Sequence, residues 1–428
     1  MITLKPWQPA SADKLTAALL QYKVACDTSD PGTGKTYVAA EVIRKANVKP
    51  LIIVPKSGVT GFRRVMEQAG ITPHDVLNIE KLKTGKTPWL TKKGRDYQWK
   101  APGDSLLVFD EAHGCGGIDS DNGKILALAK AYGYPVLMMS ATMATSPLRM
   151  RAPGYLMNLH EYRMSSFYPW CRAHGCYNSP FVLGKLEFPT GPGRIPHLQA
   201  LHKAMEPYTA RVRIADVPDF PECDIQPKLY DLDEKYTDQI NAIYAEMDKE
   251  IASPNPLAPS LVLKLRARQR VELIKVPLLA DLVEEILEEG RSAVVFLNFR
   301  EPLEQLKAAL DVRGISSVHI YGQDSNRQVK IDLFQTGFAR VFLIMSQAGG
   351  VSISLHDLDG QFPRTALLTP SVVAEHMKQC LGRIWRADGK SKAIQQFVLA
   401  AKTVEEDVYK KMLGKIKSID LINDGDMF

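Results

Sequence analysis

The sequence has no apolar run that approaches the roughly 20 residues needed to span a bilayer. Its first residues, MITLKPWQPA, lack the hydrophobic region of a secretory signal. The 6 cysteines follow no regular spacing, which disfavours a disulfide framework and favours a reducing compartment. Neither sign of charge dominates, since the net charge of +6 permits a polyanionic partner without requiring one. We therefore expect an intracellular protein with no membrane partner.

The bulk composition is that of a globular protein. Hydrophobic residues make up 45% and charged residues 24% of the 428 positions, and the mean hydropathy is -0.15. This length is sufficient for two to three domains that each bury a core of their own.

Short, nearly continuous apolar runs alternate with helical stretches in both halves of the chain. The runs lie at 51–54, 105–109, 136–139, 293–297, 318–321, 341–345, 365–368 and 394–399. Such runs are typical of strands that are buried on both faces of a parallel sheet. The sequence therefore predicts the α/β fold class, with two parallel-sheet domains.

The middle of the chain differs from both halves. Residues 151–222 are dense in proline, glycine and aromatic residues, and helices are predicted at 233–251 and 261–275. We predict domains at 1–155 and 276–428, with an irregular and helical insertion at 156–275. Within it, the spacing of Cys171, His174 and Cys176 permits a zinc site, but structural zinc sites usually contain CxxC pairs, so we favour simple packing.

One segment, CDTSDPGTGKT at 26–36, has the features of a phosphate-binding loop because a short apolar stretch precedes it and a predicted helix follows. Gly32 and Gly34 allow several backbone N–H groups to face one anion, where a Cβ would obstruct the approach. Lys35 is then able to reach the terminal phosphates, and the Thr36 hydroxyl is available to Mg²⁺. The alternative is a glycine-rich turn that caps a helix. The predicted nucleotide-binding set is Pro31, Gly32, Thr33, Gly34, Lys35 and Thr36.

The tetrapeptide Asp110-Glu111-Ala112-His113 follows the apolar run 105–109. The carboxyl end of a buried parallel strand is where α/β sheets bind ligands. We predict that Asp110 completes the Mg²⁺ shell, directly or through water, and that Glu111 orients and deprotonates an attacking water. Considered alone, the tetrapeptide also fits a solvated acidic loop.

The tripeptide Ser140-Ala141-Thr142 ends the next apolar run. Its hydroxyl groups are suited to link the γ-phosphate end of the site to a neighbouring domain by hydrogen bonds. A simple turn is the alternative.

Two arginines, Arg383 and Arg386, lie three residues apart in the second half of the chain. At this spacing they are predicted to project from one side of a helix. Planar, permanently charged guanidinium groups stabilise the charge on a transferring phosphoryl group. The alternative is a helix with solvent-exposed arginines.

In this order, the segments resemble the ATPase motor of superfamily 2 helicases. The resemblance is closest to the Swi/Snf-type DNA translocases, particularly the annealing-helicase branch and small phage-type relatives. The loop, DEAH, SAT and QCLGRIWR at 379–386 are similar to motifs I, II, III and VI, and the similarity covers nearly the whole chain. It implies two RecA-like domains with a mostly helical insertion, ATP and Mg²⁺ as cofactors, and the cytoplasm of a bacterial or phage-infected cell.

The same resemblance implies roles for further residues. The segment LKPWQ at 4–8 is similar to the family's opening motif, which implies adenine recognition by Gln8. Motif VI implies that Arg383 and Arg386 are arginine fingers and that Gln379 contributes to nucleotide binding. Segments similar to motifs Ia, IV and V imply nucleic-acid contacts by Pro55, Lys56, Asn298, Arg300, Gly349 and Gly350.

The segment 81–100 interleaves seven basic residues with tyrosine and tryptophan. Basic side chains contact phosphates and aromatic rings stack on bases, so we predict nucleic-acid contacts by Trp89, Lys92 and Lys93. The alternative is a solvated loop that its tryptophans pin to the domain. The basic helix at 261–275 is a second candidate, with packing between domains as its alternative.

These observations predict an ATP hydrolase that moves along double-stranded or branched DNA, expected to act as a monomeric motor. Fork or branched-DNA remodelling and strand annealing are its candidate activities. A nucleotide-gated nucleic-acid clamp without processive motion and an ATP-dependent RNA helicase are the alternatives. A metabolic P-loop kinase is disfavoured, because it needs no second α/β half with paired arginines.

Overall fold

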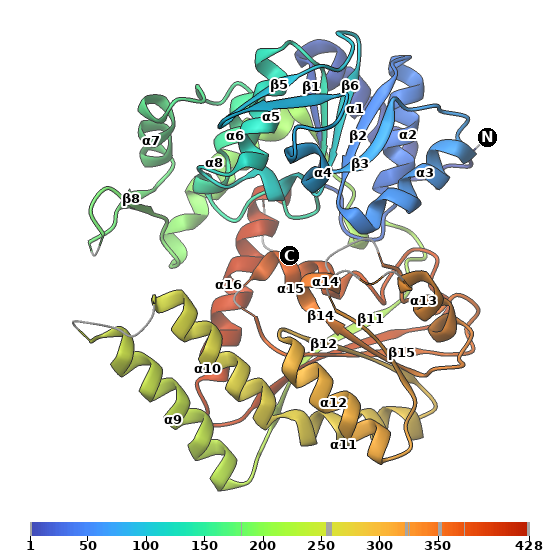
Figure 1. The fold of residues 1–428 in the computed structure, drawn as a ribbon, viewed down its shortest axis with the longest axis vertical. Helices are drawn as coiled ribbons and strands as arrows, with labels where there is room; N and C mark the ends of the chain where they lie inside the picture. The colour runs from blue at the N-terminus through green and yellow to red at the C-terminus, as the bar shows by residue number, and fades with distance from the viewer. Residues whose placement is uncertain are drawn as a thin grey trace. The chain divides into compact units, whose positions relative to one another are not determined.

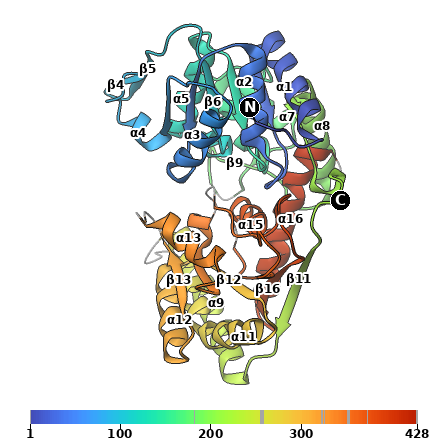
Figure 2. The ribbon, with the colours of Figure 1, turned by 90° about the vertical axis from the view of Figure 1, so that its right-hand side faces the viewer.

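The computed structural model describes residues 2–180, 182–253, 259–321, 324, 326–349, 353–371 and 373–425. The chain forms two compact units, which are drawn as ribbons in Figure 1 and Figure 2. Unit 1 comprises Met1–Pro218 and Gly414–Phe428, and unit 2 comprises Asp219–Leu413.

Unit 1 is built on a six-stranded sheet in which all neighbouring strands are parallel, in the order β10-β1-β7-β6-β2-β3. The strands are β1 (Val24–Asp27), β2 (Pro50–Val54), β3 (Asp75–Asn78), β6 (Leu106–Asp110), β7 (Val136–Met139) and β10 (Thr209–Ala210). The predicted apolar runs of this half form β2, β6 and β7. The two edge strands, β3 and β10, were not predicted.

Alternate side chains of these strands pack on opposite faces of the sheet. Leu107 and Phe109 belong to one apolar cluster, whereas Leu106 and Val108 belong to the other. Because successive residues of a strand point to opposite faces, a strand buried on both faces must be apolar at every position. This requirement accounts for the continuous apolar runs in the sequence.

Helices cover both faces of the unit 1 sheet. Residues of α1, α2 and α3 line one cluster, and residues of α5, α6 and α8 line the other. The helices are α1 (Gln8–Tyr22), α2 (Lys35–Ala46), α3 (Val59–Gln68), α4 (Ile79–Lys83), α5 (Asp121–Ala131), α6 (Arg151–Leu156), α7 (Met164–Ala173) and α8 (Ile195–Met205).

Within the described residues of both units, no helix has both the length and the apolar character that a bilayer crossing requires.

Unit 2 contains a second six-stranded parallel sheet, in the order β11-β16-β15-β12-β14-β13. Its strands are β11 (Cys223–Tyr230), β12 (Ser292–Leu297), β13 (Ser317–Ile320), β14 (Val341–Met345), β15 (Arg364–Leu368) and β16 (Ala393–Ala400). Its helices are α9 (Glu234–Ile251), α10 (Ser260–Ile274), α11 (Val276–Glu288), α12 (Arg300–Val312), α13 (Arg327–Gln335), α14 (Ser346–Gly349) and α15 (Ala374–Leu381). Two parallel-sheet α/β units confirm the predicted fold class.

The middle of the chain does not form a unit of its own. The predicted insertion 156–275 is divided between the two units, with the boundary after Pro218. The boundary lies there because β10 pairs with the sheet of unit 1, whereas β11 pairs with the sheet of unit 2. The last helix, α16 (Glu405–Asp424), begins in unit 2 and ends in the part of the chain that belongs to unit 1.

The start of α16 is held in unit 2 by a buried ion pair. The ammonium of Lys275 lies 2.7 Å from Oε1 of Glu405 and also donates to the carbonyl of Val398 at 3.1 Å. The second carboxylate oxygen of Glu405 accepts the N–H of Ala400, at 2.9 Å. The Lys275 side chain is 1% exposed and that of Glu405 is 7% exposed, so each charge depends on the other for compensation.

We expect Glu405→Gln to destabilise unit 2 by about 3 kcal/mol, because it leaves the buried Lys275 ammonium without a counter-charge. Hydrogen exchange of β15 and β16 peptides in increasing urea measures the loss. The matched control is the double variant Lys275→Met with Glu405→Leu, which removes both charges together. It should lose less than half as much stability, and an equal loss in both variants would contradict this role for the pair.

Candidate active site

The predicted phosphate-binding loop connects β1 to α2 in unit 1. Gly32 and Gly34 have φ angles of 87° and 92°, which favour glycine. A Cβ on Gly34 would lie 2.2 Å from Nε2 of Gln8, so a side chain there would displace the Gln8 amide from the loop. The ammonium of Lys35 donates to the carbonyls of Ser29 and Asp30, at 2.8 and 3.1 Å. The loop therefore curls around its own lysine.

The start of α1 holds the loop from the other side. The carbonyl of Thr33 accepts Nε1–H of Trp7 at 3.1 Å and Nε2–H of Gln8 at 2.9 Å. Gln8 is 3% exposed, and its Oε1 accepts the N–H of Lys5 at 2.9 Å. The amide of Gln8 thus supports the loop backbone, while its role toward adenine stays a prediction. Trp7 was not predicted as a loop contact, although its position next to Gln8 was visible in the sequence.

The acidic pair follows β6. Glu111 has a φ of 52°, an unusual conformation for a residue with a side chain and one that often marks functional sites. Burial, together with the charge of Glu111, raises the pKa of Asp110 to about 7, while the ammonium of Lys35 opposes this shift. Burial lowers the pKa of Lys35, whereas the charges of Asp27, Glu111 and Asp110 raise it. The structure therefore brings Lys35 and both predicted carboxylates into one electrostatic cluster.

Ser140 connects the loop strand to the acidic segment. In the sheet, β7 lies between β1 and β6, so its end is adjacent to both. The N–H of Ser140 donates to the carbonyl of Asp27 at 2.9 Å, and its hydroxyl lies 3.0 Å from Nδ1 of His113. The hydroxyl also accepts the N–H of Thr142, at 3.2 Å. These described bonds lie within unit 1, whereas the sequence had suggested a link to a neighbouring domain.

The side chains of this cluster fit a nucleotide with a divalent cation. Hydroxyl and carboxylate oxygens, here Thr36 and Asp110, are the ligands that Mg²⁺ prefers. Oδ2 of Asp27 is buried and has no hydrogen-bond partner among the described residues. Burial also raises the pKa of Asp27. A raised pKa means that the ionised carboxylate lacks compensating positive charge. A bound cation would supply this charge.

The two predicted arginine fingers lie in unit 2, but not on a helix. The helix α15 ends at Leu381 and is followed by Gly382, so Arg383 and Arg386 belong to the segment after it. The prediction of a shared helical face was therefore wrong. Both guanidinium groups nevertheless converge, because Arg383 and Arg386 donate to the same carbonyl, that of Ile353, at 3.3 and 3.2 Å. Gln379 lies in the last turns of α15 and is 5% exposed.

Comparisons with known proteins show which family this chain resembles. The conserved C-terminal domain of helicases matches residues 275–388. A putative ATP-dependent RNA helicase of Acanthamoeba polyphaga mimivirus is 31% identical over 465 aligned positions, which cover 99% of this chain and 84% of that protein. CHROMATIN REMODELING 24 of Arabidopsis thaliana and the DNA excision repair protein ERCC-6-like of Homo sapiens are 27% and 28% identical, each over 33% of this chain. The chain belongs to the Swi/Snf-type superfamily 2 helicases.

The extent of these similarities differs. The matched regions make up 13% of the Arabidopsis protein and 11% of the human protein, so most of either relative has no counterpart here. The SWI2/SNF2 ATPase core of Sulfolobus solfataricus, solved in complex with double-stranded DNA, aligns with 100% of this chain and 94% of that chain. Its TM-score is 0.39 and its identity 16%, a likeness too weak to decide anything further. As a member of a helicase ATPase family, the protein is expected to use ATP and a divalent metal.

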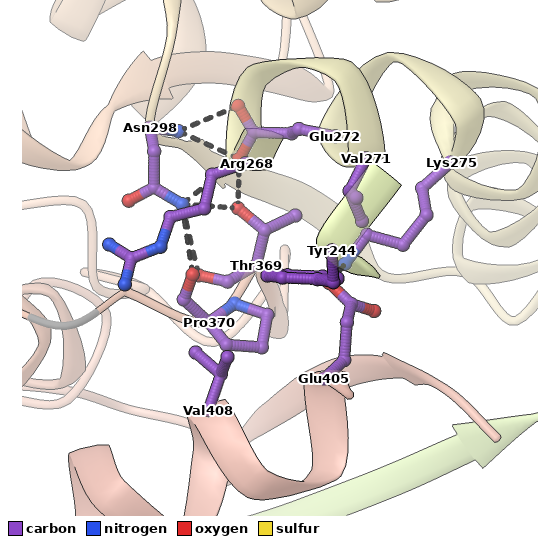
Figure 3. Close-up of a pocket in the computed structure, with 10 residues that line it drawn as sticks. All are labelled: Tyr244, Arg268, Val271, Glu272, Lys275, Asn298, Thr369, Pro370, Glu405 and Val408. Carbon is purple, nitrogen blue, oxygen red and sulfur yellow. Dashed lines mark hydrogen bonds and ion pairs between the residues drawn. The ribbon is translucent and has the colours of Figure 1, made fainter. Parts of the chain in front are cut away.

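In this Swi/Snf-type helicase, Asn298 is part of a closed polar network in unit 2 (Figure 3). Its side-chain amide donates to Glu272 Oε1 at 3.0 Å, to Thr369 Oγ1 at 2.9 Å and to the carbonyl of Pro370 at 3.2 Å. The carboxylate of Glu272 also accepts the N–H groups of Asn298 and Phe299. The donor group of Asn298 is thus committed to fixing the ends of β12 and β15, although a nucleic-acid contact was predicted for it.

The remaining predicted contacts of unit 2 differ in exposure. Arg300 is exposed, donates to Glu304 at 2.7 Å and stacks its guanidinium over the Tyr321 ring at 4.5 Å. Gly349 ends α14, and Gly350 lies outside the described residues. In unit 1, Pro55 is half-buried and Lys56 exposed at the end of β2.

The basic segment 81–100 forms a hairpin of β4 (Leu90–Lys93) and β5 (Asp96–Trp99), visible at the edge of unit 1 in Figure 2. Trp99 is buried and donates to the carbonyl of Ile125 at 3.1 Å. Trp89 is half-buried and donates to Asp75 at 3.3 Å. Both tryptophans therefore attach the hairpin to unit 1. In contrast, its exposed side chains include Lys86, Lys92, Lys93, Arg95 and Lys100.

The cysteine and histidine residues of the middle segment pack in a small apolar core. Cys171 and Cys176 are buried free thiols that cluster with Phe167 and Leu186. His174 lies over Trp170, with 4.3 Å between the ring centroids. Across the described part of the chain, no three histidine, cysteine or acidic side chains are grouped so as to hold a metal ion. The packing interpretation is the one that this geometry supports.

The raised pKa of Asp110 predicts a pH-dependent stability. The folded chain holds a proton on Asp110 up to about pH 7, while the unfolded chain releases it near the ordinary value of 3.8, so the residue costs stability as the pH rises through this interval. Without nucleotide or metal, the gain in stability of Asp110→Asn over wild type should be about 1–2 kcal/mol larger at pH 8 than at pH 6.

Thermal unfolding at pH 6, 7 and 8 measures this difference. Asp104→Asn is the matched control for the removal of a carboxylate, since Asp104 is an exposed acid of the same unit. The loss of the Asp110 carboxylate should also abolish ATP hydrolysis. A difference between Asp110→Asn and wild type that does not change between pH 6 and pH 8 would contradict the assigned titration.

Proposed function

We propose that this protein is an ATP-dependent translocase that couples ATP hydrolysis to movement along DNA. The observation that carries the proposal is the meeting of Lys35 with Asp110 and Glu111 at the carboxyl edge of one parallel sheet. This edge combines a cationic group for phosphate, an acid for a metal and an acid for a water. The paired arginines on the second parallel-sheet unit supply the charge that phosphoryl transfer requires.

Each side chain has a defined part in hydrolysis. Lys35 and the loop bind the β- and γ-phosphates, while Thr36 and Asp110 are the residues suited to hold Mg²⁺. When bound, Mg²⁺ neutralises charge on the phosphate oxygens. Glu111 accepts a proton from the water whose oxygen bonds to the γ-phosphorus as the bond to the β–γ bridging oxygen breaks. Arg383 and Arg386 stabilise the charge that develops on the transferring group, and the products are ADP and phosphate.

DNA is the substrate that we favour. Two relatives carry names that refer to chromatin remodelling and to DNA excision repair, although the chain matches only a small part of each. The mimivirus relative, which the chain matches almost throughout, is named as an RNA helicase. We propose movement on double-stranded or branched DNA, with fork remodelling or strand annealing as the outcome. RNA unwinding is the second candidate.

The ATPase rate measured with single-stranded, duplex, forked and RNA ligands tests this proposal. We expect duplex or forked DNA to raise the rate at least about tenfold, because binding energy from DNA contacts is available to complete the site. Lys35→Ala should abolish hydrolysis through lost phosphate contacts, and Arg386→Ala through lost transition-state stabilisation. Arg313→Ala is a matched control for the loss of an arginine in unit 2, since Arg313 is exposed and pairs only with the surface acids Asp281 and Glu284 among the bonds described. A clear preference for RNA, or wild-type turnover in Lys35→Ala, would overturn the assignment.

Displacement of the third strand from a DNA triplex separates a translocase from a nucleotide-gated clamp. A translocase clears the third strand in an ATP-dependent manner, whereas a clamp that binds and releases DNA leaves it in place. Lys35→Ala in the same assay reports any displacement that does not need hydrolysis. Stimulated ATPase without displacement would favour the clamp.

The outer face of the β4–β5 hairpin is a candidate DNA contact. We expect Lys93→Glu with Arg95→Glu to raise the DNA concentration for half-maximal ATPase stimulation about tenfold. The slope of log affinity against log salt concentration should fall by the amount expected for the loss of roughly two phosphate contacts. The rate without DNA should not change. Lys14→Glu with Lys23→Glu, an equal charge change on exposed residues at α1, is the control. Equal effects of the two double variants would show that net charge alone is responsible.

A further inference from the structure

The end of α16 is built into unit 1 rather than projecting from it. Leu421 and Ile422 are each 1% exposed and belong to the apolar cluster that α8 and the sheet of unit 1 share. The carbonyl of Ile422 lies 3.0 Å from Nδ1 of His202 on α8. This packing places the next two residues, Asn423 and Asp424, at the segments that form the candidate active site.

Asp424 reaches the phosphate-binding loop through one arginine. The guanidinium of Arg211 donates to both carboxylate oxygens of Asp424, at 2.6 and 2.8 Å. The same guanidinium lies 2.9 Å from Oδ1 of Asp30 and also donates to the carbonyl of Thr28. Arg211 is thus shared between a carboxylate of the loop and a carboxylate from the end of the described chain. Bidentate pairs of this kind fix orientation as well as distance.

The link continues to the catalytic lysine of the proposed mechanism. The carbonyl of Asp30, whose side chain contacts Arg211, accepts the ammonium of Lys35 at 3.1 Å. The side chains of Arg211 and Asp424 are only 14% and 8% exposed, so water compensates little for the loss of either charge. Removal of the Asp424 carboxylate would take from Arg211 its bidentate partner and leave the guanidinium to Asp30 and the carbonyl of Thr28, both in the loop.

Asn423 makes a second, independent link. Its side-chain amide donates to the carbonyl of Ala141 at 2.8 Å, and the residue is 4% exposed. Ala141 follows Ser140, whose N–H donates to the carbonyl of Asp27 at the end of β1. Asn423 therefore holds the segment that connects the loop strand to the acidic pair.

We propose that Asp424 and Asn423 are positioning residues for ATP hydrolysis, so that the end of α16 sets the conformation of the phosphate-binding loop and of residues 140–142. Neither residue is assigned a contact with the nucleotide. The inference rests on the proposed ATPase function. It adds that residues about 400 positions after the loop influence how the loop binds nucleotide. Its consequence is that nucleotide affinity depends on whether the end of α16 is docked.

Asp424→Asn is the direct test, because it keeps the shape of the side chain and removes its charge. We expect the affinity for a fluorescent ADP analogue, measured without nucleic acid, to fall about tenfold, the scale of one charge-assisted hydrogen bond. Hydrogen exchange of the peptide 26–36 should accelerate, and the KM for ATP should rise more than kcat falls. Asp424→Glu, which retains the carboxylate, should recover most of the affinity.

Gln199→Ala is the matched control. Its side chain donates to the carbonyl of Gly425 at 3.0 Å. The substitution therefore removes a contact to the end of α16 that, among the described bonds, is not linked to the phosphate-binding loop or to residues 140–142. It should leave nucleotide affinity unchanged. If Asp424→Asn does not fold, Asn423→Ala tests the second link, with faster exchange expected in residues 140–142.

The outcomes separate this inference from the proposed function. Wild-type protein that binds no nucleotide would refute the ATPase assignment itself. Wild-type protein that binds nucleotide, with Asp424→Asn and Asn423→Ala showing the same affinity and exchange, would refute only the positioning role. An equal loss in Gln199→Ala would also refute it, because docking of the helix in general would then account for the effect.

Discussion

The candidate active site depends on a ladder of hydrogen bonds between the phosphate-binding loop and the segment around β10. The N–H groups of Thr28 and Asp30 donate to the carbonyls of Ala210 and Val212, each at 3.0 Å. The N–H of Ile214 donates back to the carboxylate of Asp30, at 3.0 Å. Two glycines, Gly32 and Gly34, leave the loop backbone freedom that its own side chains restrict only in part, so contacts from outside the loop contribute to its conformation. In this protein a partner some 180 residues further along the chain supplies these contacts.

Much of the fold was predictable because it follows from burial on two faces. The continuous apolar runs that became β6, β7 and β12 have no other simple explanation in an α/β chain. The strands that were missed lack this signal. β10 is only two residues long, and β11 is an edge strand with several exposed positions, so their pairing is decided by tertiary contacts rather than by local pattern.

The candidate site likewise has parts that could be predicted from the sequence and parts that could not. Lys35 and Asp110 were predictable because the chemistry of phosphate and metal binding restricts both residue type and place, a glycine-rich turn and a strand end. The arginine pair was predicted by residue but not by conformation. Spacing of three residues suggested a helical face, whereas Gly382 follows the end of α15 and precedes Arg383. The docking of Asn423 on a backbone carbonyl could not be predicted, since such a contact has no sequence signature.

The balance of charge explains why nucleotide and metal binding should be coupled in this site. Asp27, Asp30, Asp110 and Glu111 act on Lys35, and Arg211 is a second cation beside them, so the acidic groups of the isolated site outnumber its basic groups. Burial, together with the charge of Glu111, raises the pKa of Asp110, and proton uptake there relieves part of the excess. An anionic nucleotide alone would increase the excess. A divalent cation held by Thr36 and Asp110 would reverse the excess, so we expect the two ligands to bind best together and proton release to accompany them.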